Sequence, residues 1–429
     1  MAARVPPPLR SIELFSGSGG LAIGTHLAGF RHAALVEWNP FACSTLHQNI
    51  AAEALPGIGD WRVVQSDARA VDFDQFGPID LVAGGPPCQP FSLAGKHGGM
   101  RDPRDTFPEF IRAIRCLRPR AFIAENVRGL LRPSFAKYFA YLTLQLSLPC
   151  LERCRGEPWR SHAARLKLAS LDADAADRYA VTATLLNAAD YGVPQVRRRL
   201  VIVGIRGDLG RQWIPPRATH SHMALLQDQG QGGAYWERHG LTAPSVDSQV
   251  ASAQPLLCPA GEPGDGCAPL PWRTVRDALM GPPPLPEPTL EEAPGFSNHQ
   301  VRPGARVYDG HTGSVLDFPA KTLKAGVHGV PGGENMLVAP DGLARYFTLR
   351  EAARLQMFPD SWTFQGPWTQ AMRQLGNAVP VELARQVAHS VATIITPRGR
   401  SSQPLTGGTR TRDIEKRLSD GTVIRCPGR

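Results

Sequence analysis

Short apolar segments alternate with helical patterns through the first two hundred residues of the chain. Continuous apolar runs predict four strands that are buried on both faces: SIELF (11–15), AALVE (33–37), IDLVAG (79–84) and AFIAEN (121–126). Helices are predicted between them at 21–30, 40–54 and 107–117, and two further strands at 181–188 and 200–205. This order predicts an α/β fold with a doubly wound, mostly parallel sheet and right-handed crossovers.

The pattern changes after Ile205. Of the 50 residues from Pro255 to Gly304, 18 are glycine or proline, so residues 206–345 are predicted to form a smaller, loop-rich domain. Helical periodicity returns at 349–359 and 380–395, and the basic segment 397–429 is expected to be flexible. Residues 130–180 hold an apolar and a polar helical segment, which we interpret as an insertion in the first domain.

Composition narrows the class of protein. A hydrophobic content of 42% is typical of a globular chain, even with 43 glycines and 40 prolines among 429 residues. A formal net charge of +9 favours a polyanionic partner. Because the chain lacks an apolar run of membrane-spanning length and a secretory signal pattern, we expect no membrane association and a cytoplasmic location. The eight cysteines are irregularly spaced, so neither a disulfide framework nor a metal site is expected.

The first motif, FSGSGG (15–20), lies between the first predicted strand and the first predicted helix. Glycines there let a ligand approach the backbone at a helix N-terminus, although a tight turn also explains them. Glu37 ends the next strand, where a carboxylate can accept hydrogen bonds from ribose hydroxyls, and Asp67 follows the strand after that. Each acid alone is better explained as a helix N-cap or a solvated loop residue. Together, the three features favour an adenosine-containing cofactor.

The second motif, GGPPCQPFS (84–92), follows the strand predicted at 79–84. Its prolines stiffen the turn and place Cys88 at the carboxyl edge of the sheet. A structural cysteine lies more often inside a helix or strand, buried and inert. The loop position therefore favours a nucleophile, whose activity requires thiolate character.

Two further motifs supply charged groups. Glu125, in ENV (125–127), ends a strand at the same edge, where a carboxyl group with a pKa raised by burial can act as an acid or hydrogen-bond donor. QVRRR (195–199) precedes the last strand, and strand alternation would put Arg197 and Arg199 on one face. This pair is either a cationic partner for a carbonyl oxygen or phosphate, or a solvated basic strand end.

In this order, the motifs resemble those of the DNA (cytosine-5) methyltransferase family. The resemblance covers FSGSGG, Glu37, Asp67, GGPPCQPFS, ENV and QVRRR, followed by REAARLQMFP (350–359) and GNAVP (376–380). It implies a catalytic and cofactor-binding domain in residues 1–205 and 346–396, split by a target-recognition domain in residues 206–345. In the family, the helix after the last motif packs back beside the first strand.

The resemblance also implies S-adenosyl-L-methionine as cofactor. The residues that it places around this cofactor are Phe15, Ser16, Gly17, Gly19, Gly20, Glu37, Trp38, Asp67, Ala68, Pro87, Asn377 and Val379.

The mechanism implied by the resemblance uses four residues. The Cys88 thiolate adds to carbon-6 of cytosine, Glu125 stabilises or protonates ring nitrogen 3, Arg197 holds the O2 carbonyl, and Arg199 buttresses the site. Carbon-5 then takes the methyl group, and loss of its proton expels Cys88. Because these atoms lie inside the base stack of a duplex, the target base must be flipped out.

Double-stranded DNA is the implied partner, with Gln89, Ser92, Lys324 and His328 as expected contacts. In the segment 319–337, Glu334 and Asn335 are further candidates for contacts with base edges, although a plain β-hairpin explains this segment equally well. A cognate restriction endonuclease or other defence proteins are possible partners, and we expect a monomer.

Three rival functions remain open at this point. An RNA cytosine methyltransferase of the same fold carries a Cys-Phe-Thr signature near the ENV motif, whereas this chain reads ENVRGL. A catalytically inactive DNA-binding relative would lose the thiol or the acid, and both are present. A nicotinamide-dependent oxidoreductase would use the glycine-rich turn but would give PPCQPFS no role.

Overall fold

The computed structural model describes residues 8–87, 105–230, 232–244, 268–309, 311–325 and 335–396, together with the backbone of two short strands near the C-terminus. The chain divides into two compact units. Unit 1 comprises Met1–Leu186, Arg198–Pro216 and Ser361–Arg425, and unit 2 comprises Asn187–Arg197, Arg217–Asp360 and Cys426–Arg429.

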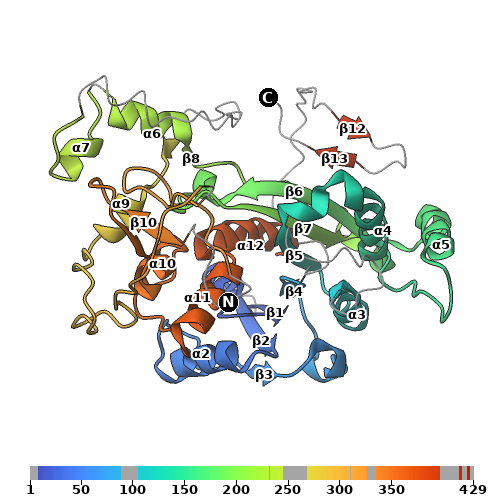
Figure 1. Ribbon diagram of the computed structural model, residues 1–429. Helices are drawn as coiled ribbons and strands as arrows, with labels where there is room; N and C mark the ends of the chain where they lie inside the picture. Colours follow the sequence, from blue (N-terminus) through green and yellow to red (C-terminus); the bar gives the residue numbers. More distant parts are fainter. Residues whose placement is uncertain are drawn as a thin grey trace, which may run out of the picture. The chain divides into compact units, whose positions relative to one another are not determined.

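A seven-stranded sheet forms the centre of unit 1 (Figure 1). Its strands are β1 (Leu9–Leu14), β2 (Phe30–Glu37), β3 (Val63–Gln65), β4 (Leu81–Gly84), β5 (Ala121–Val127), β6 (Tyr179–Asn187) and β7 (Arg198–Arg206). Their order is β3-β2-β1-β4-β5-β7-β6. The pairs from β3 through β5 are parallel, and β7 runs antiparallel to β5. The predicted mostly parallel sheet is therefore confirmed, with its strand order reversing between β1 and β4.

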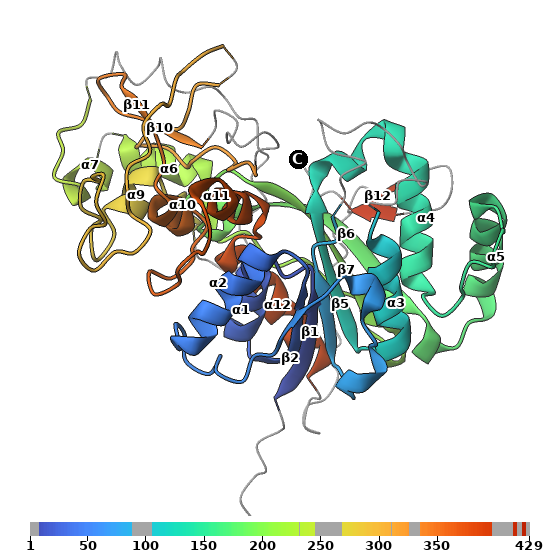
Figure 2. The same ribbon diagram turned by 60° about the horizontal axis from the view of Figure 1, so that its bottom comes forward.

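Helices cover both faces of this sheet. Figure 2 shows α1 (Gly20–Leu27), α2 (Pro40–Ala51) and α12 (Val381–Ile395) on one side, and α3 (Phe107–Leu117) and α4 (Ala136–Ser147) on the other. Helix α12 packs closely on α1, because a Cβ added at Gly24 would lie 2.4 Å from the Cβ of Ala384. The segment that follows unit 2 in the chain thus returns to cover the sheet.

Two helices occupy the segment 130–180 that we interpreted as an insertion. Helix α4 is followed by α5 (Trp159–Asp172), and the two share a small apolar cluster that includes Tyr141 and Leu166. The Tyr141 hydroxyl also lies 2.8 Å from Nδ1 of His162. This contact joins α5 to α4, which itself packs on the sheet.

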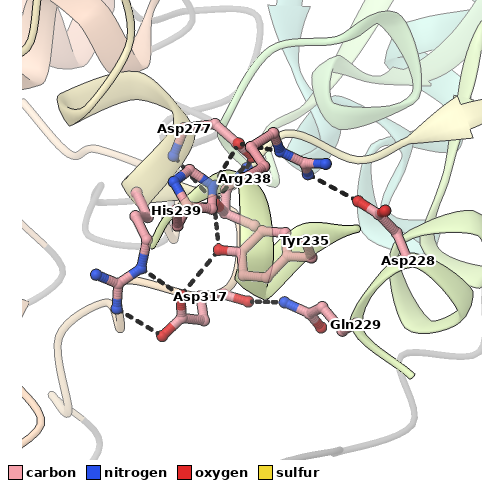
Figure 3. Close-up of polar contacts among 9 residues, drawn as sticks. Asp228, Gln229, Tyr235, Arg238, His239, Asp277 and Asp317 are labelled. Atoms are coloured by element: carbon pink, nitrogen blue, oxygen red, sulfur yellow. Dashed lines mark hydrogen bonds and ion pairs between the residues drawn. The ribbon is translucent and has the colours of Figure 1, made fainter. Parts of the chain in front are cut away.

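Unit 2 is built from short elements. Its helices are α6 (His222–Gln229), α7 (Tyr235–Arg238), α9 (Val275–Leu279) and α10 (Leu349–Leu355), and its strands are β8 (His220–Ser221), β9 (Leu270–Pro271), β10 (Met336–Val338) and β11 (Ala344–Tyr346). Polar contacts link α6, α7 and α9 (Figure 3). The bounds of unit 2 differ from the predicted target-recognition range of 206–345, because 187–197 and 346–360 are assigned to unit 2 and 206–216 to unit 1. The functional roles of the two units remain predictions.

The remaining elements lie after unit 2 in the chain. Helix α11 (Trp368–Asn377) precedes α12, and β12 (Glu415–Arg417) pairs with β13 (Val423–Arg425). The rest of the predicted flexible segment 397–429 lies outside the described residues. None of the helices in the described part of the chain has the length and apolarity that a membrane crossing requires.

Candidate active site at the carboxyl edge of the sheet

Four of the predicted motifs meet at one edge of unit 1. The loops after β1, β2, β4 and β5 all leave the carboxyl ends of neighbouring parallel strands. The strand order reverses between β1 and β4, and ligands of open α/β sheets bind outside the strand ends at such a reversal. The fold therefore places the glycine-rich loop and the start of the GGPPCQPFS loop on either side of the expected binding position.

The glycine-rich loop has an unusual backbone. Phe15, Gly17 and Gly19 have φ angles of 58°, 54° and 93°, a region that side chains with a Cβ rarely adopt. A Cβ added at Gly17 would meet no atom of the described residues within 4 Å, so within this part of the chain Gly17 borders open space. The loop is closed by a hydrogen bond of 3.0 Å from the Gly19 amide to the Ser16 carbonyl, and α1 begins at Gly20.

Glu37 fixes this loop to the end of β2. Its Oε2 accepts from the Gly17 amide at 2.7 Å, and its Oε1 accepts from the amides of Trp38 and Asn39 at 2.9 and 2.8 Å. Burial raises the pKa of Glu37, and the three amide donors oppose that shift. A carboxylate has about four acceptor positions, so the three amides leave one for a ligand hydroxyl.

The other predicted cofactor residues of β2 and β3 differ in exposure. Trp38 is 71% exposed. Asp67 is exposed as well and caps the short helix Ala68–Ala70, since its Oδ1 accepts from the Arg69 amide at 2.9 Å. Ala68 itself is buried. The helix-cap explanation of Asp67 is thus correct, and its second oxygen pairs with Arg69 at 3.1 Å.

These residues fit a nucleoside-containing cofactor. Open space borders Gly17, Glu37 retains acceptor capacity for a hydroxyl, and the exposed indole of Trp38 can stack on a purine. Asn377, at the end of α11, is exposed in unit 1, whereas Val379 is buried.

The loop expected to carry the nucleophile is described only as far as Pro87. Cys88, Gln89 and Ser92 lie outside the described residues, as does His328. The described start of the loop is tied to β5, because the Asn126 side-chain amide donates to the Pro86 carbonyl at 3.0 Å. Residue Asn126 of the ENV motif therefore positions the segment that leads to Cys88.

Glu125 and Arg199 form a buried ion pair on the strands β5 and β7. Arg199 Nε lies 2.8 Å from Glu125 Oε1, and both residues are less than 10% exposed. Burial lowers the pKa of Arg199, whereas the Glu125 carboxylate raises it. The Glu125 carboxyl also borders the loop after β4, since its Oε2 would lie 3.3 Å from a Cβ added at Gly85. The pair fixes one carboxylate beside the Cys88 loop.

Arg197 lies in unit 2 and is fully buried. Its Nη1 donates to the Leu323 carbonyl at 2.8 Å and to Oε1 of Gln195 at 3.3 Å. Strand β7 begins only at Arg198, so the alternation argument does not extend to Arg197. The structure thus assigns the two predicted arginines to different units and gives each its own partners.

The predicted DNA-contact segment of unit 2 requires one correction. Lys324 is exposed, in agreement with a contact role. Asn335, by contrast, is fully buried, and its side-chain amide pairs twice with the backbone of Lys324, with both bonds 2.8 Å long. Both ends of the amide are used within the protein, so the expectation that Asn335 touches a base edge is wrong.

Comparison with known proteins identifies the family. Residues 9–147, 166–237 and 308–393 match the family model described as C-5 cytosine-specific DNA methylase. The chain is 31% identical over 396 residues to the type II methyltransferase M.Eco47II of Escherichia coli, covering 90% of this chain and 79% of that protein. It is 30% identical over 390 residues to M.NgoMIV of Neisseria gonorrhoeae, covering 89% and 96%.

A solved structure shares the fold. It is described as a DNA modification methyltransferase encoded within a prophage of Escherichia coli, and it aligns with a TM-score of 0.54 and 22% identity over 90% of this chain and 99% of that one. At this identity the likeness concerns the fold alone. The sequence matches carry the identification: this chain belongs to the C-5 cytosine-specific DNA methylase family. It is a DNA (cytosine-5) methyltransferase, and DNA is its substrate.

Proposed function

We propose that the protein transfers a methyl group from S-adenosyl-L-methionine to carbon-5 of a flipped-out cytosine within a specific sequence of double-stranded DNA. The observation that carries this proposal is the buried Glu125–Arg199 pair, which fixes a carboxylate beside the loop that leads to Cys88. An enzyme that adds a nucleophile to a cytosine ring needs such a group, because charge develops on the ring during the addition.

The glycine-rich loop, Glu37 and Trp38 would hold the cofactor. In this arrangement Glu37 accepts a hydrogen bond from a ribose hydroxyl, Trp38 stacks on the adenine, and the loop backbone lies against the rest of the molecule. When bound, S-adenosyl-L-methionine supplies a methyl group on a positively charged sulfur, ready for attack by a nucleophile. Phe15, Ser16, Gly20, Asp67, Ala68, Pro87, Asn377 and Val379 complete the proposed set.

Cys88 would be the nucleophile. Carbon-5 of cytosine is a weak nucleophile while the ring is aromatic. Addition of the Cys88 thiolate to carbon-6 forms a sulfur–carbon bond and moves the ring electron pair toward carbon-5 and nitrogen 3. After methylation, solvent takes the carbon-5 proton, the electron pair of that C–H bond re-forms the double bond between carbon-5 and carbon-6, and the bond between carbon-6 and sulfur breaks with its electrons on Cys88. The thiolate is thereby regenerated.

Glu125 would share a proton with ring nitrogen 3. The neighbouring guanidinium of Arg199 stabilises the ionised form of Glu125, so the shared proton is held toward the base rather than toward the carboxylate. This bias helps nitrogen 3 to accept electron density when Cys88 adds. Arg197 would bind the O2 carbonyl, with its guanidinium oriented by the bonds to Leu323 and Gln195.

Unit 2 would recognise the target sequence. Base-edge contacts give sequence information, whereas phosphate contacts only position a protein on DNA. We assign recognition to the range 206–345, with Lys324 and His328 as contacts, and assign Gln89 and Ser92 to the neighbourhood of the flipped base. A role in a restriction-modification system is supported by the relatives that are named type II methyltransferases. We propose that it acts as a monomer in the cytoplasm, alongside a cognate endonuclease.

Covalent trapping tests the proposed chemistry. A duplex that carries 5-fluorocytosine at the target position cannot lose its carbon-5 substituent as a proton, so the bond to Cys88 should persist after methyl transfer. We expect a denaturation-resistant complex with the cofactor present and none with Cys88→Ser, while Cys116→Ser, which changes an exposed cysteine, traps as the wild type does. A trapped complex in Cys88→Ser would overturn the assignment. Trapping on an RNA substrate alone would favour the RNA-specific alternative.

A further inference from the structure

The segment 361–366, which follows unit 2 in the chain, is bound along helix α2. Asn49 on α2 pairs with both backbone groups of Thr363: its Oδ1 accepts from the Thr363 amide at 2.8 Å, and its Nδ2 donates to the Thr363 carbonyl at 2.7 Å. Thr45, one turn earlier, accepts from the Gln365 amide at 2.9 Å. Asn49 and Thr45 are almost fully buried, so these bonds are protected from water.

Both ends of this segment are fixed as well. The Ser361 hydroxyl donates to the Ala54 carbonyl at 2.6 Å, just beyond the end of α2. Gly366 has a φ of 101°, and a Cβ there would lie 2.6 Å from the ring of Phe41 at the start of α2. The segment therefore has little freedom to shift along the helix.

This anchoring places Trp362 beside the glycine-rich loop. Trp362 is fully buried, and its Nε1 donates to the Ser18 carbonyl at 3.1 Å. Its ring also contacts the next residue of the loop, because a Cβ added at Gly19 would lie 3.1 Å from the ring carbon Cζ2. Gly19 has a φ of 93°, and Gly17, two residues earlier, borders open space. One side chain thus holds the loop at two successive residues.

We propose that Trp362 is a positioning residue that holds the glycine-rich loop in the conformation that binds the cofactor. This inference rests on the proposed function, in which the loop binds S-adenosyl-L-methionine. A loop with three residues at positive φ has competing conformations, and the measured affinity falls in proportion to the fraction of molecules in the binding conformation. The indole N–H stabilises that conformation, because it donates a hydrogen bond to the carbonyl of a buried loop residue, Ser18.

Trp61 offers a matched control. It is buried like Trp362, and the two rings lie 6.4 Å apart. Its Nε1, however, has no hydrogen-bond partner among the described residues. Trp61→Phe and Trp362→Phe therefore remove the same atoms from neighbouring positions, but only the second removes a bond to the loop.

The experiment measures the dissociation constant of S-adenosyl-L-methionine for the three proteins by calorimetry, together with the midpoint of urea unfolding. We expect Trp362→Phe to weaken cofactor binding about tenfold, while Trp61→Phe stays within about twofold at a comparable loss of stability. In methylation assays, Trp362→Phe should raise KM for the cofactor and leave KM for DNA and kcat nearly unchanged.

Two results would overturn the inference. Unchanged cofactor binding by Trp362→Phe would show that the loop keeps its conformation without the indole N–H. Equal weakening by Trp61→Phe would show that the effect comes from lost packing. If the wild-type protein itself does not bind S-adenosyl-L-methionine, the proposed cofactor is wrong, and the role of Trp362 falls with it.

Discussion

Each unit shows one kind of interior contact clearly: apolar packing in unit 1 and a polar network in unit 2. Unit 1 contains a continuous apolar cluster that joins strand residues such as Ile12 and Val82 to helix residues such as Phe110 and Leu142. In unit 2, one apolar cluster joins Ala189, Leu225, Tyr235 and Trp272, and α9 and α10 bury further apolar side chains. Polar groups also link its helices α6, α7 and α9.

The polar groups of unit 2 form a connected network (Figure 3). The Tyr235 hydroxyl donates to Asp317 at 2.8 Å, and Asp317 also accepts two hydrogen bonds from Arg276 at 2.6 and 2.9 Å. Asp277 lies 2.9 Å from Nε2 of His239, and Asp228 accepts from Arg238 at 2.7 Å. These contacts connect α6, α7 and α9 to the segment around Asp317.

This difference has consequences for substitution. The stability of apolar packing depends on how completely the side chains fill the interior, so it falls when atoms are removed or added. The stability of a polar network depends on each buried group keeping its hydrogen-bond or ion-pair partner. It falls when one member of a pair is removed and the other stays buried. If unit 2 recognises DNA, its surface loops can change in sequence while this network holds their supporting helices.

The largest expected effect concerns chemistry in unit 1. Cys88→Ala should lower the methylation rate by about four orders of magnitude, because no other group in the proposed mechanism adds to carbon-6. Cofactor binding and the unfolding midpoint should stay unchanged. Single-turnover transfer of labelled methyl groups measures the rate, with Cys116→Ala as control. Retained turnover in Cys88→Ala would refute its role as the nucleophile.

The next effect concerns a polar group inside the apolar unit 1. His32 is buried with its Nε2 2.9 Å from the Ala22 carbonyl, and burial lowers its pKa to about 4. Its folded pKa lies below the unfolded value, so its contribution to stability is complete above pH 6.5 and is lost as the pH falls toward 4. Wild-type protein should lose about 3 kcal/mol of unfolding free energy across this window that His32→Gln does not lose. Urea unfolding at several pH values measures this, and identical pH dependence in both proteins would contradict it.

A smaller effect should follow from overfilling unit 1. Gly24→Ala places a Cβ 2.4 Å from Ala384 and 2.7 Å from the backbone nitrogen of Arg385, so α1 and α12 must separate. We expect a loss of about 2 kcal/mol in unfolding free energy. Gly59→Ala is the control, because the nearest atom to its added Cβ is 3.9 Å away. Equal unfolding midpoints for the two variants would show that the helix contact tolerates the extra atom.

A comparable or slightly smaller effect should follow from breaking the network of unit 2. Asp317→Asn removes the charge that faces Arg276 and leaves one acceptor oxygen, in place of two, for Arg276 and the Tyr235 hydroxyl. We expect a loss of about 1–2 kcal/mol, at the low end for a broken pair because Asp317 is 30% exposed. Asp309→Asn, which changes an exposed aspartate of the same unit, should have almost no effect. Calorimetric unfolding of both variants measures the difference, and an unchanged Asp317→Asn profile would show that the network does not stabilise unit 2.

The sheet of unit 1 could be predicted because its strands are continuous apolar runs between glycine-rich turns. The same pattern predicted Glu37 and Glu125 near the ends of their strands, where the structure has them. The carboxyl ends of neighbouring parallel strands lie at one edge of the sheet, so the shared edge could be predicted as well. Helix α11, which carries Asn377, was not predicted. Its N-terminus has no side-chain cap, and its sequence, WTQAMRQLGN, mixes polar and apolar residues closely.

Contacts between distant polar groups could not be predicted. Asn335 was one candidate for a base contact, with a structural position in a β-hairpin as the alternative. Its amide pairs with the backbone of Lys324, and that pairing depends on the path of the chain between them. Trp362 gave no signal either, because its partner Ser18 lies 344 positions away in the sequence. The periodicity of apolar residues reports burial, whereas the partner of a buried polar atom is set only by the folded structure.

The central claim is that this chain methylates carbon-5 of cytosine in a specific DNA sequence. The most direct test supplies S-adenosyl-L-methionine with a labelled methyl group and unmethylated genomic DNA, and then maps 5-methylcytosine by conversion sequencing. We predict labelled DNA with 5-methylcytosine confined to one short sequence. Incorporation into RNA but not DNA, or no incorporation into either by a protein that binds the cofactor, would contradict the account.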